Sequence, residues 1–345
     1  METIRKNYMG SMIFTIIAMA IGFLYGMQST GSVELALQMV FLIFVLGALE
    51  VSLSFDNAVA NAKVLNTMSP EWQHRFITWG MVIAVFGMRV ILPVLIVYAT
   101  SNAGLFEIID TAIHDSKKYG EMLHESEFAI MGFGASFLSL VFFAFFFDAE
   151  KETHWIKPIE RQLVKLGRLS SMSMAIAMLI SGIMSFYVPE EKQVTFLIAS
   201  GLGIMIHQLM ESLGESMENT DLTVSVTKAG LSSFIYLELL DMSFSLDGVI
   251  GAFVVTSNIV VIGLGLGIGA LFVRSMTLHL VHSGKLAEYR YLEHGAFWAI
   301  GILVAIMYAK PFIEIPEYVT GLLSIGVILL AVGSSISYNK KEESL

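Results

Sequence analysis

The sequence of 345 residues contains no cysteine. This absence excludes disulfide bonds and thiolate-ligated metal centres, and it leaves methionine as the only sulfur ligand for a soft metal. Charged residues are also scarce, because they make up 14% of the chain, against about 25% in a soluble domain. No basic tract typical of a nucleic-acid partner and no ATP-binding motif occurs, so we expect any transport to be secondary or channel-like. We also expect no organic cofactor and no enzymatic activity.

Long apolar stretches dominate what remains. Hydrophobic residues make up 55% of the sequence, and a membrane-spanning helix needs about 20 consecutive apolar residues. On this criterion the sequence predicts an all-α polytopic membrane protein with about ten transmembrane helices. The predicted spans lie near residues 9–28, 35–62, 76–99, 128–147, 171–188, 193–210, 230–256, 259–281, 291–309 and 317–337.

The distribution of Lys and Arg predicts the orientation of these spans. With ten spans, the loops on the face that holds both termini carry 14 Lys and Arg residues, and the opposite loops carry four, Lys117, Lys118, Lys192 and Lys310. Cytoplasmic loops are enriched in these residues. We therefore predict that the protein lies in the cell (inner) membrane with both termini cytoplasmic.

One short acidic phrase occurs twice within the apolar stretches. Residues 50–57 read Glu-Val-Ser-Leu-Ser-Phe-Asp-Asn, and residues 241–248 read Asp-Met-Ser-Phe-Ser-Leu-Asp-Gly, at an offset of 191 residues. Carboxylates at bilayer depth cost roughly 2.5–3.5 kcal/mol each on insertion scales, so they are rare and usually functional. The phrases fall in the second and seventh spans, and an odd separation makes those spans antiparallel. The sequence therefore predicts a five-plus-five inverted repeat, residues 1–192 and 193–345, with a shared site near the midplane.

A second pattern supports the repeat. Gly80 and Arg89 in the third span have the same spacing as Gly265 and Arg274 in the eighth. A guanidinium group is a hydrogen-bond donor only and cannot bind a cation. We therefore expect the two arginines to be structural counter-charges of the acids. An alternative interpretation is that the acids do nothing beyond pairing with these arginines.

The side chains of the two phrases offer oxygen ligands only. Hard divalent cations prefer such ligands, and manganese is the transition metal that shares this preference. The predicted substrate is therefore a divalent cation, manganese first and calcium next, and the surplus of carboxylates suggests protons as the coupling ion. The candidate ligands are Glu50, Ser54, Asp56, Asn57, Asp241, Ser245 and Asp247.

A straight helix could not direct both acids of the first phrase at one ion. Glu50 and Asp56 are six residues apart, which places them roughly 240° apart around an ideal helix. A local break in the helix would bring them together. In the second phrase, Gly248 and Gly251 mark the place where we expect such a break.

Two longer loops interrupt the repeat. Residues 100–126 are acidic, and we expect a disordered, solvated loop there, with attraction of cations to a pore mouth as the alternative. Residues 148–169 are basic and amphipathic, which is typical of a helix on the anionic cytoplasmic leaflet.

The acidic phrases resemble the two signatures of the TerC (tellurium-resistance integral membrane) family, within the lysine-exporter-like superfamily. The chain is more similar to a TerC-related group known only as a domain of unknown function, from about Glu34 to Ser335. That similarity rests on two segments, Phe-Phe-Phe-Asp-Ala-Glu-Lys-Glu-Thr-His-Trp-Ile-Lys-Pro-Ile-Glu at 145–160 and Tyr-Arg-Tyr-Leu-Glu-His-Gly-Ala at 289–296.

The resemblance implies manganese export and, more loosely, tellurite resistance. It also implies metal binding by five of the candidate ligands, Glu50, Asp56, Asn57, Asp241 and Asp247. The chain departs from the repeat by having glycine at position 248 where the first copy has an amide. The resemblance gives no role to the block that contains Asp148, Glu150 and His154.

Three functions compete at this stage. The leading hypothesis is a secondary transporter, most plausibly an exporter, whose partners are the metal ion and the lipid bilayer, with no nucleic acid. A metal-binding membrane sensor or scaffold in a stress-resistance complex is the alternative. The remote alternative is an intramembrane aspartyl protease with Asp56 and Asp247 as its catalytic pair.

Overall fold

The structure is a computed structural model that describes residues 2–167, 171–218, 222–256, 258–284, 288–313, 315 and 317–342. All regular elements of the described chain are helices, and these ranges contain no strand. The helices are α1 (Glu2–Thr30), α2 (Val33–Leu53), α3 (Phe55–Thr67), α4 (Pro70–Val82), the π-helix η1 (Ile83–Ile91), α5 (Leu92–Thr100), α6 (Leu105–His114), α7 (Ser116–Glu125), α8 (Glu127–Phe146), α9 (Lys157–Gly167), α10 (Met172–Ser185), α11 (Glu190–Glu218), α12 (Leu222–Val255), α13 (Ile259–Ser283), α15 (Leu292–Ala309) and α16 (Glu317–Glu342).

Eight stretches of the described helices are long and apolar enough to cross a membrane. They lie in α1, α2, α8, α11, α13, α15 and α16, and in the stretch from Pro70 to Thr100 that joins α4, η1 and α5. The bent pair of α9 and α10 makes a ninth if it forms one broken span. The chain is therefore an all-α polytopic membrane protein, as the sequence predicts.

The predicted count of ten spans differs from these eight or nine at two places. Residues 171–188 correspond to α10, which has 14 residues and is too short to span a bilayer alone. Residues 230–256 correspond to α12, a helix of 34 residues in which some side chains lie outside the described part of the chain. The remaining predicted spans overlap described helices, except that the span predicted at 35–62 is divided into α2, which ends at Leu53, and α3.

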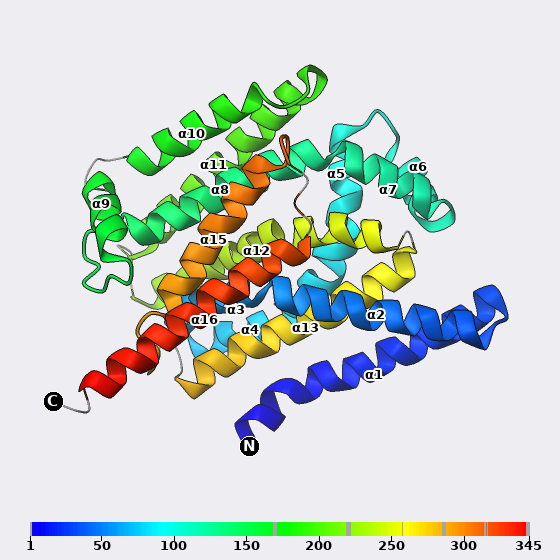
Figure 1. Cartoon of the computed structure of the whole chain (residues 1–345), viewed down its shortest axis with the longest axis horizontal. Helices are drawn as coiled ribbons and strands as arrows, with labels where there is room; N and C mark the ends of the chain where they lie inside the picture. The colour runs from blue at the N-terminus through cyan, green and yellow to red at the C-terminus, as the bar shows by residue number, and fades with distance from the viewer. Residues whose placement is uncertain are drawn as a thin grey trace.

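The helices that carry the two acidic phrases run in opposite directions. Figure 1 shows α2, α3, α12 and α13 together in the middle of the molecule. Near the start of α2, Asn258 at the end of the α12–α13 turn donates to the Tyr25 hydroxyl at 3.4 Å. At the other end, the ring of Trp72, just after α3, lies 6.0 Å from that of Phe234 near the start of α12. The end of α12 therefore faces the start of α2, which is the antiparallel arrangement that the sequence predicts.

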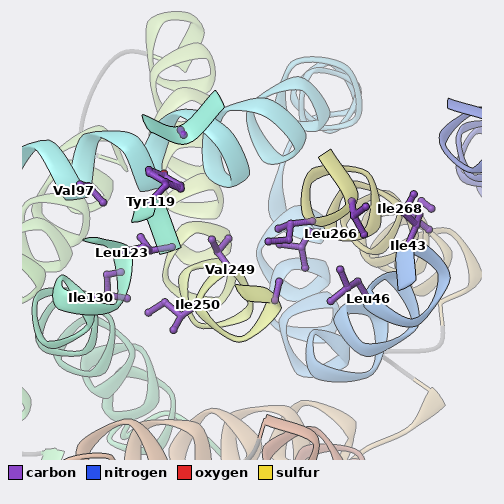
Figure 2. Packing of buried hydrophobic residues seen from close by; sticks show 14 of the residues in the cluster. Ile43, Leu46, Val97, Tyr119, Leu123, Ile130, Val249, Ile250, Leu266 and Ile268 are labelled. Atoms are coloured by element: carbon purple, nitrogen blue, oxygen red, sulfur yellow. The ribbon is translucent and has the colours of Figure 1, made fainter. Parts of the chain in front are cut away.

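The acidic loop at 100–126 is not disordered, so that prediction is wrong. It folds into α6 and α7, because each of these helices has an apolar row at a spacing of four residues. Ile108 and Ala112 of α6, and Tyr119 and Leu123 of α7, belong to a buried cluster with residues of α12. Figure 2 shows Leu123 beside Val249 of α12. The acids of the loop occupy the opposite, exposed faces of the two helices.

Candidate functional site

The first acidic phrase contains the predicted helix break. α2 ends at Leu53 and α3 begins at Phe55, and Ser54 between them has φ −106° and ψ 20°, away from the helical values near −63° and −42°. Its N–H still donates to the Glu50 carbonyl at 3.0 Å. The break therefore changes the direction of the side chains after Ser54, and both Glu50 and Asp56 are buried.

The second phrase has no break, so that part of the prediction is wrong. α12 continues as one helix through Gly248. The glycine has a different use there, because a Cβ atom at this position would lie 2.7 Å from Oε2 of Glu50. Gly248 therefore makes room for the carboxylate of Glu50 instead of bending its helix.

Glu50 of α2 forms a buried ion pair with Arg89 of η1. Nη2 of Arg89 donates to Oε1 of Glu50, and Nη1 donates to the carbonyl oxygen of Ala84 at 2.6 Å. Ser54 donates from its hydroxyl to the same Oε1 at 3.5 Å. Removing either charge would leave the other unpaired in the membrane interior, which is costly.

The π-helical segment that carries Arg89 has a sequence cause. Pro93 follows four residues later and has no N–H to give to the Arg89 carbonyl, so the regular α-helical pattern cannot continue. The N–H of Leu92 instead bonds to the carbonyl of Gly87, five residues back. This wider turn is the segment from which Arg89 reaches Glu50.

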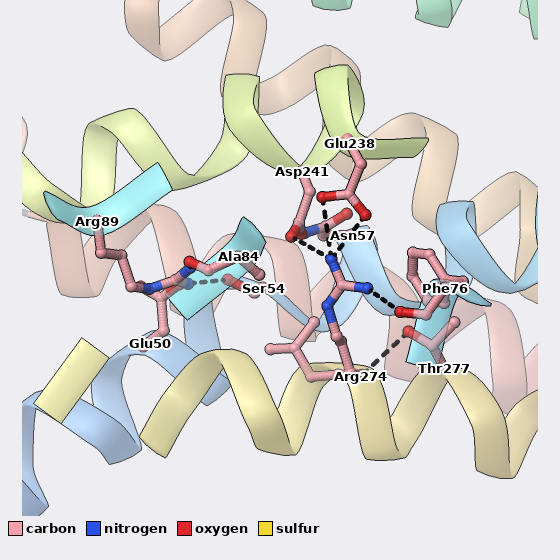
Figure 3. Close-up of polar contacts among 11 residues, drawn as sticks. Glu50, Ser54, Asn57, Phe76, Ala84, Arg89, Glu238, Asp241, Arg274 and Thr277 are labelled. Carbon is pink, nitrogen blue, oxygen red and sulfur yellow. Dashed lines mark hydrogen bonds and ion pairs between the residues drawn. The ribbon is translucent and has the colours of Figure 1, made fainter. Parts of the chain in front are cut away.

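The second half contains the corresponding pair. Nη2 of Arg274 on α13 contacts Oδ2 of Asp241 at 3.4 Å and both carboxylate oxygens of Glu238 at 3.1 and 3.3 Å. Nη1 donates to the carbonyl oxygen of Phe76 at 2.7 Å. Figure 3 shows this arginine between the two α12 acids and Phe76. The expectation that the arginines are counter-charges agrees with both sets of contacts.

Glu238 is a site residue that the sequence reasoning missed. It is buried, and it lies one turn before Asp241 on α12. The position that corresponds to it in the first half is Gly47, so the repeat gives no signal for it. The available signal was a second acid three residues from Asp241 within an apolar run.

The two halves touch through a second matched pair of contacts. Nδ2 of Asn57 on α3 donates to Oδ1 of Asp241 at 2.6 Å. At the offset of 191 residues, Asn57 in the first phrase is equivalent to Gly248 in the second, and Glu50 is equivalent to Asp241. The close approach of Gly248 to Glu50 is thus the counterpart of the hydrogen bond between Asn57 and Asp241. Each phrase therefore contacts the first acid of the other phrase.

Several buried oxygen atoms in these phrases, and one just after the first phrase, have no hydrogen-bond partner among the described residues. They are Oδ2 of Asp56, Oδ1 of Asn57, Oδ1 of Asn61 and Oγ of Ser245. Asp56 is only 1% exposed, and its other oxygen, Oδ1, accepts from the Asn57 N–H at 3.0 Å. Buried polar groups are nearly always satisfied, so the unpartnered oxygens of Asp56, Asn57 and Ser245, which line two adjoining gaps, suggest a ligand.

Two adjoining gaps hold the predicted site residues. One is a narrow gap, too small for a water molecule, that is lined by Glu50, Ser54, Asn57, Asp241 and Ser245, with Arg89 beside them. The other is a cavity of about 20 Å³ lined by Glu50, Ser54, Asp56 and Gly248 among others, which has room for about one water molecule.

Six of the seven predicted ligands therefore lie around these two gaps. The side chain of the seventh, Asp247, lies outside the described part of the chain. Within the described part, no three His, Asp or Glu side chains stand close enough to share a metal ion. An ion in these gaps would therefore be bound by amide and hydroxyl oxygens as well as carboxylates.

A family model for proteins of unknown function, DUF475, matches residues 55–342, which is more than four fifths of the chain. The chain belongs to the DUF475 family. No curated protein and no solved structure matches it. The DUF475 match covers Asp56, Asn57 and the whole second phrase, and it begins just after the helix break. It carries no link to the TerC family, so that resemblance stays a prediction.

Proposed function

We propose that this DUF475 protein is a secondary transporter that exports a divalent cation, manganese or calcium, through the gaps between α3 and α12. The observation that carries the proposal is the free, buried carboxylate oxygen of Asp56, whose side chain lines the cavity next to the gap that Asn57 and Ser245 line. Oxygen ligands of this kind suit hard divalent cations. The close approach of two antiparallel phrases supports a site shared by two inverted repeats.

The charges around the gaps favour a divalent ion. Four acids of the described site, Glu50, Asp56, Glu238 and Asp241, face two guanidinium groups, those of Arg89 and Arg274. These four acids exceed the two arginines by two negative charges before Asp247 is counted, and uncompensated charge inside a membrane is costly, so a bound cation would stabilise the site. When the cation leaves, protons are the simplest replacement, which supports protons as the coupling ion.

The distribution of Lys and Arg supports the proposed orientation. With both termini in the cytoplasm, Thr67 at the end of α3 faces the cytoplasm, and Ser101 after α5 faces the opposite side. We place the protein in the cell membrane on this ground. An ion that enters from the cytoplasm would then pass along α3 to reach Asp56.

A metal-binding panel on purified protein in detergent tests the proposal. We expect manganese to bind with an affinity at least tenfold higher than magnesium. Asp56→Asn should abolish binding, because among the four described acids of the site Asp56 alone has no ion pair with an arginine, and asparagine keeps the shape of the side chain. The matched control is Glu127→Gln. Glu127 is a partly buried acid at the start of α8, and it pairs with Lys310. Equal binding by the wild type and Asp56→Asn would overturn the proposed site.

A further inference from the structure

The two segments that distinguish this chain in sequence, 145–160 and 289–296, meet around one buried carboxylate. Glu160 of α9 is 0% exposed. It accepts from the backbone N–H groups of Trp155 and Ile156, both at 3.1 Å, and from Nε1 of Trp298 on α15 at 3.1 Å. Nε2 of His294 lies 3.5 Å from the same carboxylate. Glu160 therefore fixes the loop before α9 against the first turn of α15.

Lys63 of α3 reaches this assembly from the acid-bearing helix. Its Nζ lies 3.2 Å from Oε2 of Glu293 on α15 and 4.2 Å from the centre of the Phe145 ring on α8. Phe145 is itself stacked on Phe297 at 4.0 Å. Lys63 follows Asp56 by seven residues, which is two turns of α3. The end of α3 is thus tied to α8 and α15 by one side chain.

A second lysine contacts the same aromatic ring. Nζ of Lys151, in the loop before α9, lies 3.7 Å from the centre of the Phe145 ring, so the two ammonium groups are less than about 8 Å apart. The charged groups that face Lys151 are Lys63 on α3, Asp148 and His154 in the loop, Glu160 on α9, and Glu293 and His294 on α15.

Burial is the main reason that the pKa of Lys151 falls to about 8, and the nearby charge of Lys63 lowers it further, while Glu160 opposes the shift. Below pH 8 Lys151 is charged and repels Lys63. Above pH 8 it is neutral, and the repulsion is lost. Lys63 then retains its ion pair with Glu293 and its contact with the Phe145 ring, and no second cation repels it.

We propose that the contacts of Lys63 with Glu293 and Phe145 form a latch that closes the cytoplasmic end of the path along α3, and that a charged Lys151 loosens this latch. The break at Ser54 separates α3 from α2, so α3 can move as a short unit once its far end is released. The proposal rests on the proposed function for the position of the path. It assigns the block around His154, which the sequence left without a role, to the regulation of access.

The cysteine-free sequence allows a direct test by thiol labelling. Asn61→Cys places a thiol at a buried position of α3. Asn66→Cys places one at an exposed position of the same helix, beyond Lys63. The measured quantity is the rate at which a charged maleimide added on the cytoplasmic side labels position 61, divided by the rate at position 66. We expect Lys63→Gln to raise this ratio at least tenfold, and the matched control Lys310→Gln, which breaks an ion pair elsewhere, to leave it unchanged.

The pH dependence tests the second lysine. In the wild-type background the ratio should fall severalfold as the pH rises from 6.5 to 9. Lys151→Met should be slow at every pH, and Lys151→Arg, which stays charged, should be fast at every pH. Glu293→Gln removes the acidic partner of the same ion pair and should raise the labelling ratio as Lys63→Gln does. The test therefore remains valid if one of the two variants fails to fold.

No change in the ratio with Lys63→Gln and Glu293→Gln would overturn the latch, and a pH response that persists in Lys151→Arg would overturn the role of Lys151. The labelling needs no metal. A normal latch in a protein without metal transport would therefore reject the proposed function alone, and metal transport with an unchanged ratio would reject the latch alone.

Discussion

Arg89→Gln should destabilise the protein by about 3–5 kcal/mol, the usual cost of removing one partner of a buried ion pair. Both side chains of the pair are almost fully buried, at 3% exposed for Arg89 and 4% for Glu50. The substitution also removes the donor to the Ala84 carbonyl. The magnitude comes mainly from the charge of Glu50, which would remain inside the membrane without a counter-charge.

Equilibrium unfolding in mixed micelles, with an increasing fraction of denaturing detergent, measures this free energy. The control is Arg75→Gln, because Arg75 pairs with Glu71 on the surface of α4, where the two side chains are 41% and 71% exposed. That change should cost less than about 1 kcal/mol. The double variant of Arg89→Gln and Glu50→Gln should recover most of the loss. Equal costs for Arg89→Gln and Arg75→Gln would refute the counter-charge interpretation.

Two further substitutions test how the two phrases fit together. Gly248→Ala should cost about 1–3 kcal/mol, because its Cβ would lie 2.7 Å from the Glu50 carboxylate; Gly263→Ala, on α13 with open space around it, should be neutral or stabilising in the same unfolding assay. Asn57→Ala should cost about 1.5–3 kcal/mol, because it removes a 2.6 Å hydrogen bond to the buried Asp241 carboxylate. A thermal unfolding midpoint equal to that of the wild type in either variant would contradict the contact concerned.

The sequence was informative where the repeat itself carries the structure. The matched acids and arginines predicted that the two phrases would meet and that α2 and α3 would be separated by a break. A separation of six residues between Glu50 and Asp56 is incompatible with one straight helical face, and the structure resolves this at Ser54. The same reasoning failed at Gly248, because a glycine in a helix can serve close packing as well as bending.

The parts that the sequence did not predict depend on contacts between distant segments. Glu238 has no counterpart in the first half, and its pairing with Arg274 is seen only in the structure. The carboxylate of Glu160 gains its importance from Trp298 and His294, which lie more than 130 residues away in the chain. No local pattern reports such a pairing. The apolar residues of α6 and α7 recur at a helical spacing and form a buried face. The prediction of a disordered loop relied on the acidic composition of this segment and overlooked that spacing.

Flux of manganese across a membrane tests the central claim most directly. Purified protein would be reconstituted into liposomes that enclose a manganese-sensitive dye, with a proton gradient imposed across the bilayer. We expect rapid dye quenching with the wild type and with Glu127→Gln, and quenching no faster than in protein-free liposomes with Asp56→Asn. Binding of manganese without any flux would instead favour a metal-binding sensor or scaffold. Equal flux by the wild type and Asp56→Asn would contradict the assignment of Asp56 as the carboxylate that carries the ion.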